Sequence, residues 1–270
     1  MNSPICETCG TQFAPCAQPP AHCPICEDDR QYVGWTGQRW TTHAALAASH
    51  DLRLGEDAGL FALALSREFA IPQRALLLPT QAGNILWECL SLVTDVAVAA
   101  LQARGGVDRI VISHPHFYAS MVQWSDALGG VPVLLHAADQ AWVQRPARCI
   151  EHWQGDHLAL GDGVTLVRTG GHFPGSTALH WTDGPRGGGA LFVGDSPQVA
   201  SNRRSVSFMH SYPNLVPMRP ADVRAMRERL APFDYDDAYG FSWGRNILGG
   251  ARSAIDASFD RYLAAVAGGA

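Results

Sequence analysis

The chain of 270 residues contains no lysine, because all 20 of its basic residues are arginines. This absence excludes Schiff-base chemistry, a phosphate-loop lysine and a lysine general base. The sequence also lacks an apolar run of the roughly 18 residues that a membrane-spanning helix needs. Its first residues show neither the basic nor the apolar region of an export signal. We therefore expect a cytoplasmic protein without a membrane partner.

Positive charge is scarce as well, since the formal net charge is −5. A nucleic-acid backbone demands a basic footprint, so nucleic acid is disfavoured as the main partner. What the chain has in quantity is histidine, with 11 residues, and cysteine, with 7. Both are metal ligands, and the composition therefore indicates metal chemistry with a small-molecule substrate. Whether the chain forms a homo-oligomer is left open.

The cysteines gather at the N-terminus, where two CxxC motifs lie within the first 26 residues. Cys6 and Cys9 form the first motif, and Cys23 and Cys26 form the second. Each motif places two thiolates on one side of a tight turn, so the pair completes a tetrahedral four-sulfur site. Two disulfides are the alternative, which the absence of an export signal disfavours. Zinc is the expected ion, and iron suits the same ligands.

The cysteine-rich segment predicts a division of the chain into a ribbon at residues 1–36 and a main domain at residues 37–270. So short a segment cannot bury a core, and metal binding would supply its folding free energy. We interpret Cys16 as a free structural thiol. Cys89 and Cys149 lie in apolar stretches and are expected to be ordinary buried cysteines.

The main domain alternates strand-like and helix-like segments, which favours an α/β fold of two sheets covered by helices. Apolar runs bounded by turn residues predict strands within 59–71, 74–89, 107–116, 131–139, 158–173, 175–183 and 189–197. Amphipathic patterns predict helices within 42–50, 93–106, 118–130, 219–233 and 251–269.

Three histidines and one aspartate follow predicted strands. His114 and His116 are two residues apart, so on extended backbone both rings point the same way and can reach one ion. His172 lies in a glycine-rich loop after a later strand, and Asp195 lies at the end of the last predicted strand. Three imidazoles and a water form the open arrangement of catalytic zinc, and Asp195 adds a carboxylate ligand or an acceptor that orients the water.

The order of these motifs (HPHFY, then GGHFPGS, then a strand ending in GD) resembles the metallo-β-lactamase superfamily over about residues 50–265. The resemblance implies a four-layered αββα sandwich with the metal site on one edge. It also implies that His114, His116 and His172 form the first metal site and that Asp195 matches the carboxylate between the two metals. The N-terminal segment is similar to a zinc ribbon and to the rubredoxin-type module of rubrerythrins.

The second metal site of that family is degraded in this sequence. Where the family pattern has aspartate and histidine, this chain has Tyr118 and Ala119, and Trp243 is the best match for the family's last histidine. We therefore expect a mononuclear site that holds zinc or iron. Tyr118 has two interpretations, either a catalytic hydrogen-bond donor to a developing oxyanion or a residue that fills the vacated site.

These residues favour a metal-dependent hydrolase with an unknown substrate, in which Asp195 and Tyr118 are the candidate catalytic residues. Two alternatives stay open. The first is a catalytically inactive member in which the site serves metal binding or regulation. The second is an iron-dependent redox protein whose rubredoxin-like N-terminus passes electrons to the histidine site. Outside the motifs, His180 is expected to be a packed histidine, and His210 a loop residue or a replacement ligand.

Overall fold

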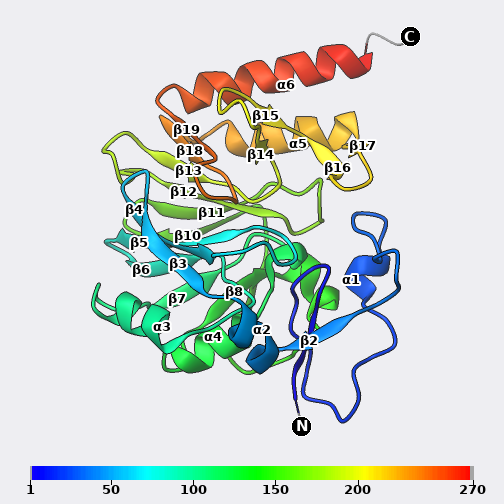
Figure 1. Ribbon diagram of the computed structural model, residues 1–270. Helices are drawn as coiled ribbons and strands as arrows, with labels where there is room; N and C mark the ends of the chain where they lie inside the picture. Colours follow the sequence, from blue (N-terminus) through cyan, green and yellow to red (C-terminus); the bar gives the residue numbers. More distant parts are fainter. Residues whose placement is uncertain (1, 268–270) are drawn as a thin grey trace.

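The computed structural model describes residues 2–267. Residue 1 of the predicted ribbon and residues 268–270 of the predicted main domain, with the end of the helix predicted within 251–269, lie outside the described residues. Two large sheets lie face to face, and helices cover their outer sides (Figure 1). This arrangement confirms the predicted four-layered αββα sandwich. None of the helices within residues 2–267 combines the length and apolar character needed to cross a bilayer.

The first sheet has seven strands in the order β3-β4-β5-β6-β7-β8-β9. Its strands are β3 (Leu52–Asp57), β4 (Leu60–Leu65), β5 (Arg74–Thr80), β6 (Gly83–Trp87), β7 (Arg109–Val111), β8 (Val133–His136) and β9 (Ile150–Trp153). The pairs from β3 to β6 are antiparallel, and those from β6 to β9 are parallel. Because β6, β7 and β8 run parallel, their carboxyl ends lie at the same edge of the sheet.

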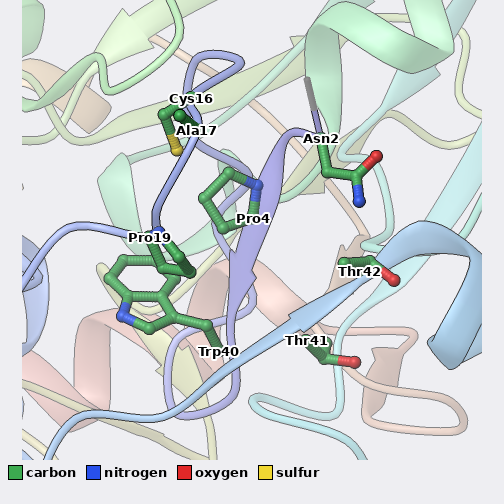
Figure 2. A pocket seen from close by; sticks show the side chains of 8 residues that line it. All are labelled: Asn2, Pro4, Cys16, Ala17, Pro19, Trp40, Thr41 and Thr42. Atoms are coloured by element: carbon green, nitrogen blue, oxygen red, sulfur yellow. The ribbon is translucent and has the colours of Figure 1, made fainter.

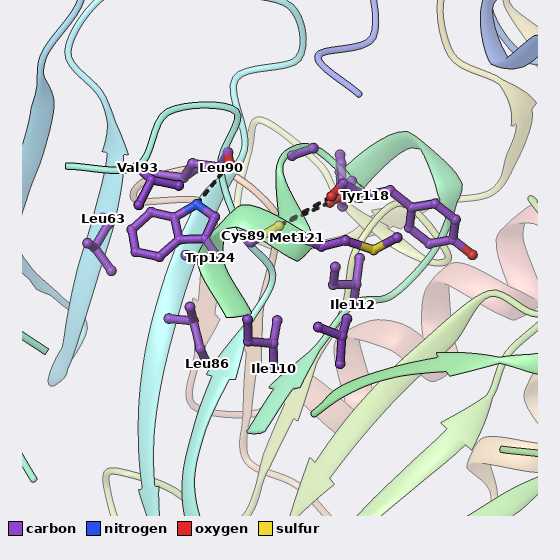
Figure 3. Close-up of a cluster of buried hydrophobic side chains, with 14 of the residues drawn as sticks. Leu63, Leu86, Cys89, Leu90, Val93, Ile110, Ile112, Tyr118, Met121 and Trp124 are labelled. Atoms are coloured by element: carbon purple, nitrogen blue, oxygen red, sulfur yellow. Dashed lines mark hydrogen bonds between the residues drawn. The ribbon is translucent and has the colours of Figure 1, made fainter. Parts of the chain in front are cut away.

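Helices α3 (Asp95–Gln102) and α4 (Met121–Ala127) cover the outer face of this sheet. Leu86 and Ile110 of the sheet share one buried apolar cluster with Trp124 of α4 (Figure 3). The Trp124 indole N–H donates to the Leu90 carbonyl at 2.9 Å, so the large ring is buried without an unsatisfied donor. This packing fixes the loop that follows β7.

The second sheet has six strands in the order β10-β11-β12-β13-β18-β19. These are β10 (His157–Gly161), β11 (Val164–Arg168), β12 (Thr177–Trp181), β13 (Ala190–Phe192), β18 (Asp237–Tyr239) and β19 (Asn246–Leu248). Helices α5 (Pro220–Leu230) and α6 (Ala251–Ala267) pack on its outer face. Between the two sheets lies a third apolar cluster that includes Trp87, Phe192 and Tyr239.

The N-terminal segment packs on one side of the sandwich (Figure 1). Its strand β1 (Pro4–Cys6) pairs antiparallel with β2 (Trp40–Thr42), and α1 (Pro24–Glu27) lies between them in sequence. Helix α2 (His43–Ser49) follows, where the Thr42 side chain accepts a hydrogen bond from the Ala45 N–H and caps the helix.

Short elements connect the main layers. They are the 3-10 helices η1 (Pro115–Phe117) and η2 (Ala137–Trp142) and the strands β14 (Gln198–Val199), β15 (Val206–Ser207), β16 (Met209–Ser211) and β17 (Val216–Pro217). The predicted helices and strands of the main domain each contain an element of the matching type. We did not predict β3, β9, β18, β19 or the two small hairpins from the sequence, and most of these strands are too short to show an alternating pattern.

Candidate metal centres

His114 and His116 follow the end of β7, where the strand enters a buried loop. The backbone of His114 is extended (φ −168°, ψ 170°), as predicted, but His116 lies in the 3-10 turn η1. The assumption that both histidines share extended backbone was therefore wrong, because Pro115 begins a helical turn. Both rings nevertheless reach the same cluster.

His172 and Asp195 come from the second sheet. His172 follows Gly170 and Gly171, whose φ angles of +66° and +78° are readily adopted by glycine. A Cβ atom at Gly171 would lie 2.4 Å from the sulfur of Met218, so the chain also needs a residue without a side chain there. Asp195 lies in the loop after β13, three residues past the end of the strand. Two loops of the second sheet thus face the loop after β7.

The four side chains converge on one point, since their nearest ligand atoms all lie within 4.8 Å of one another. His116 Nδ1 and His172 Nε2 are 3.1 Å apart. Asp195 Oδ2 lies 3.5 Å from His114 Nε2 and 3.9 Å from His172 Nε2. Ligands at about 2.0–2.1 Å from a tetrahedral ion are about 3.3–3.4 Å from each other. The residues present therefore fit a single transition-metal ion.

Hydrogen bonds from behind orient two of the rings. His172 Nδ1 donates to the carbonyl oxygen of His210 at 2.8 Å, which leaves Nε2 as the acceptor that faces the cluster. Ser113 Oγ and His114 Nδ1 form a hydrogen bond of 2.8 Å. His114 Nε2 is buried without a hydrogen-bond partner in the described chain, as expected for a nitrogen whose partner is a metal.

Burial sets the protonation of the cluster. It lowers the pKa of His116 well below its usual range and that of His172 to about 3, so both rings are neutral at pH 7. Burial alone would raise the pKa of Asp195, but its interactions with the His114 ring, 3.5 Å away, and with His172 outweigh burial and lower that pKa. Neutral imidazoles beside a carboxylate are the protonation state in which these residues bind a divalent cation.

Glu88 is a neighbour of the cluster that we did not predict. It follows β6, is completely buried and has a φ of +65°. Its Oε2 accepts a hydrogen bond from the Ser113 N–H at 3.3 Å, while Oε1 has no partner within residues 2–267. Burial raises its pKa to about 8, so the acid is mostly protonated at pH 7. The signal in the sequence was an acidic residue inside the apolar stretch ILWECL.

The positions that match the family's second metal site carry no ligand here. Tyr118 is 1% exposed within the apolar cluster of Figure 3, and its hydroxyl donates to the Asp139 carbonyl at 3.4 Å. Ala119 is also buried in this cluster. Trp243 stacks on the guanidinium of Arg53, 3.8 Å from the ring centroid. None of the three side chains is an imidazole or a carboxylate that could replace the missing ligands.

The four predicted cysteines form a second buried cluster. Sγ of Cys6 lies 3.5 Å from Sγ of Cys26, and Cys9 and Cys23 are 3.7 Å apart. Sulfurs about 2.3 Å from a tetrahedral zinc would be about 3.8 Å apart, so this donor set fits a metal ion. Interaction with Cys23 lowers the pKa of the Cys6 thiol but raises that of Cys9, so the thiols cannot all ionise easily without a cation.

The other cysteines lie apart from this cluster. Cys16 is half-buried and free, beside Trp40 and Pro19 in a small pocket of the N-terminal segment (Figure 2). Cys89 is buried as predicted, whereas Cys149 is only half-buried, because it precedes the edge strand β9.

Two other histidines that the sequence singled out, His180 and His210, have structural partners. His180 Nε2 bonds the Asp234 carbonyl at 2.8 Å, and its ring packs against Phe233, which confirms a packed histidine. The His210 ring faces away from the cluster toward Asp29, with 2.9 Å between Nε2 and the carboxylate. His210 therefore supports His172 through its carbonyl group and is not a replacement ligand.

The tail of the N-terminal segment, residues 28–31, joins the two clusters. Arg30 Nε donates to the His172 carbonyl at 2.6 Å, and its guanidinium lies over the Phe173 ring. Asn214, in the turn between β16 and β17, donates to the carbonyls of Asp29 and Gln31 at 3.0 and 2.9 Å. The segment that leaves the four-cysteine cluster is thus bound to the loops that hold His172.

Fold and clusters together define a metal-dependent protein of the metallo-β-lactamase fold with an N-terminal four-cysteine ribbon. The chain is similar to the structure of the metallo-β-lactamase DIM-1, with a TM-score of 0.57 and 14% identity over 80% of this chain and 98% of that one. It is also similar to the flavodiiron core of Flv1 from Synechocystis sp. PCC6803, with a TM-score of 0.52 and 15% identity over 80% of this chain and 61% of that one.

Within this class, the chain belongs to the same family as YmaE of Bacillus subtilis strain 168, described as an uncharacterized protein. The two are 36% identical over 265 residues, which cover 97% of this chain and 96% of YmaE. No known family model matches the sequence.

Proposed function

We propose that the chain is a hydrolase of a small-molecule substrate that uses one metal ion, held by His114, His116 and His172, with Asp195 beside the ion. The observation that carries this proposal is the convergence of three ring nitrogens and one carboxylate oxygen in a buried cluster. In the described part of the chain, the only other cluster of this kind is the four-cysteine site. A closed four-sulfur site is a structural site, whereas three histidines leave a position for water.

When bound, a zinc or iron ion supplies Lewis acidity and lowers the pKa of a water molecule at the site. The chain's own residues provide the rest. Asp195 presents Oδ2 to the cluster while Gln198 holds Oδ1 at 3.1 Å, so the carboxylate has a fixed orientation. It is therefore positioned to accept a hydrogen bond from the attacking water. The carbonyl of His210 holds the His172 ring in the tautomer that faces the ion.

The absence of ligands at Tyr118, Ala119 and Trp243 supports one ion in this cluster. Of the two roles considered for Tyr118, its hydrogen bond to the Asp139 carbonyl favours the filling of the vacated second site. Catalysis is then assigned to Asp195 and the ion. We propose zinc in the four-cysteine ribbon at the N-terminus and zinc or iron in the histidine cluster.

Hydrolysis is tested with a panel of esters, thioesters and lactams on metal-loaded protein. The matched variants are His116→Ala, which removes a proposed ligand, and His180→Ala, which removes a histidine outside both clusters. Turnover that is lost in His116→Ala and kept in His180→Ala supports the proposal. Equal turnover in both variants contradicts it, and absence of turnover across the panel favours the inactive binding protein.

The four-cysteine cluster gives the redox protein its own test. A rubredoxin-like iron site has a strong thiolate-to-iron absorption band, so protein purified from iron-replete medium would be red. A colourless protein with zinc in the ribbon rejects electron transfer through that site.

A further inference from the structure

Next to the histidine cluster lies a groove of about 590 Å³, a volume typical of ligand sites. Its walls include Gly170 and Gly171, which directly precede His172, and residues of the N-terminal tail, of the β16–β17 hairpin and of α5. The groove therefore lies between the ribbon and the main domain. A substrate bound there would lie against the loop that carries His172.

The ionisable residues of this groove are mostly cationic. They are Arg30, Arg168, Arg219, Arg229 and His210, with Asp222 as the single carboxylate of the lining. The chain as a whole has a net charge of −5, so the charge of this groove is opposite in sign to that of the chain. Four guanidinium groups from three different parts of the fold face one space.

Carboxylates around the groove hold these arginines in place without matching all of their charge. Asp28 pairs with Arg30 at 2.6 Å, and Asp222 pairs with Arg219 at 2.8 Å. Arg168 and Arg229, however, share the single carboxylate of Asp156. The hydrogen bond from Arg168 holds the pKa of Asp156 below its usual range. Two guanidiniums on one carboxylate leave one positive charge without a local partner.

Guanidinium groups are well suited to phosphate, because each carries five N–H donors in a planar fork. The ion pairs above use only some of these donors, so the arginines can still bind a ligand oxyanion. We propose that this groove binds a phosphate group of the substrate and that the proposed hydrolase therefore acts on a phosphate-bearing small molecule. That the phosphate belongs to a substrate rests on the proposed function, whereas phosphate binding itself is measurable without turnover.

The test is calorimetric titration of the metal-loaded protein with inorganic phosphate at low ionic strength. Arg219→Gln/Arg229→Gln removes two groove cations, and Arg224→Gln is the matched control, since Arg224 is exposed on the same helix and does not line the groove. Loss of charge-assisted hydrogen bonds is expected to raise the phosphate Kd about tenfold or more in the double variant. The control should retain the wild-type Kd.

The variant His116→Ala distinguishes phosphate bound in the groove from phosphate bound directly to the metal ion of the histidine cluster. We expect this variant, which weakens the proposed metal site, to keep the phosphate affinity. Equal Kd values for the double variant and the control would contradict phosphate binding in the groove. Loss of binding in His116→Ala, or the absence of saturable binding to the wild type, would contradict it as well. Acetate, titrated in parallel, should bind more weakly than phosphate, and equal affinity would reject the phosphate assignment. Saturable phosphate binding without any hydrolysis would contradict the proposed function but support the phosphate site in the groove.

Discussion

Arg30 Nε donates to the carbonyl oxygen of His172 at 2.6 Å, so the tail of the four-cysteine ribbon contacts the backbone of a proposed metal ligand. The ring of the same histidine bonds the His210 carbonyl through Nδ1. Its backbone and its ring are therefore held by two different parts of the chain. The histidine cluster and the ribbon form one connected structure.

We expect about two metal ions per chain, one in each cluster. His116→Ala should lower the content to about one ion and leave the ribbon ion. Cys26→Ser should do the reverse, because three thiolates cannot complete the four-sulfur site. Elemental analysis of the purified variants measures both. His180→Ala serves as the control, and a His116→Ala protein that keeps both ions contradicts the assignment.

The contacts of Arg30 and Asn214 predict that loss of the ribbon metal reaches the histidine cluster. In Cys26→Ser, hydrogen exchange should become faster in residues 28–31 and in the β16–β17 hairpin. Metal affinity at the histidine cluster should fall about tenfold, as for other losses of groups that orient ligands. Cys149→Ser is the control, since Cys149 lies outside the ribbon. Unchanged exchange in the hairpin would show that the two clusters are independent.

Gly194, in the loop after β13 of the second sheet, packs closely against the loop after β7 of the first sheet. A Cβ atom there would lie 2.3 Å from Ser113 Oγ and 3.1 Å from His114 Nδ1. We expect Gly194→Ala to displace His114, to lose the metal of the histidine cluster and to cost about 1–3 kcal/mol of stability. Gly55→Ala is the control, because its Cβ would meet Trp243 at an ordinary 3.6 Å. Metal content and urea unfolding of both variants decide the point.

The stability of the folded protein is expected to depend on pH because of Asp139. The side chain is 1% exposed, and burial raises its pKa to about 7, although the Gly175 N–H donates to Oδ1 at 2.8 Å. The folded state thus holds a proton that the unfolded state loses near pH 4. Between about pH 4 and pH 7 this group makes the protein less stable as pH rises, by at most about 1.4 kcal/mol per pH unit.

Asp139→Asn keeps the acceptor for Gly175 and removes the titration. The variant should therefore gain stability relative to the wild type as pH rises from 4 to 7, with a constant difference above pH 8. Urea unfolding at several pH values measures this difference. A difference that does not change with pH would show that Asp139 is ionised in the folded protein.

Tyr118→Phe separates the two roles of Tyr118. Loss of the 3.4 Å hydrogen bond to Asp139 should cost about 1 kcal/mol or less, and turnover should stay within about twofold of the wild type. A fall in turnover of about 100-fold with unchanged metal content would instead assign the hydroxyl to catalysis.

The sequence predicted the residues of the two clusters because each carries a strong local signal. The CxxC pairs and the histidines next to glycine or proline mark loops at strand ends, and the layered alternation of segments predicted the sandwich. What it could not predict were contacts set by packing. Glu88 has no local motif, and the His210 carbonyl supports His172 through a backbone atom that any residue would supply. Arg30 meets His172 only after the whole chain has folded.

The contacts between the ribbon tail and the β16–β17 hairpin join residues 181 to 185 positions apart in the sequence. At about 5–20 residues per second on the ribosome, the ribbon is made roughly 10–40 s before its binding surface exists. A metal ion that the ribbon binds in this interval is held by the four thiolates before Asn214 can join the ribbon tail to the main domain.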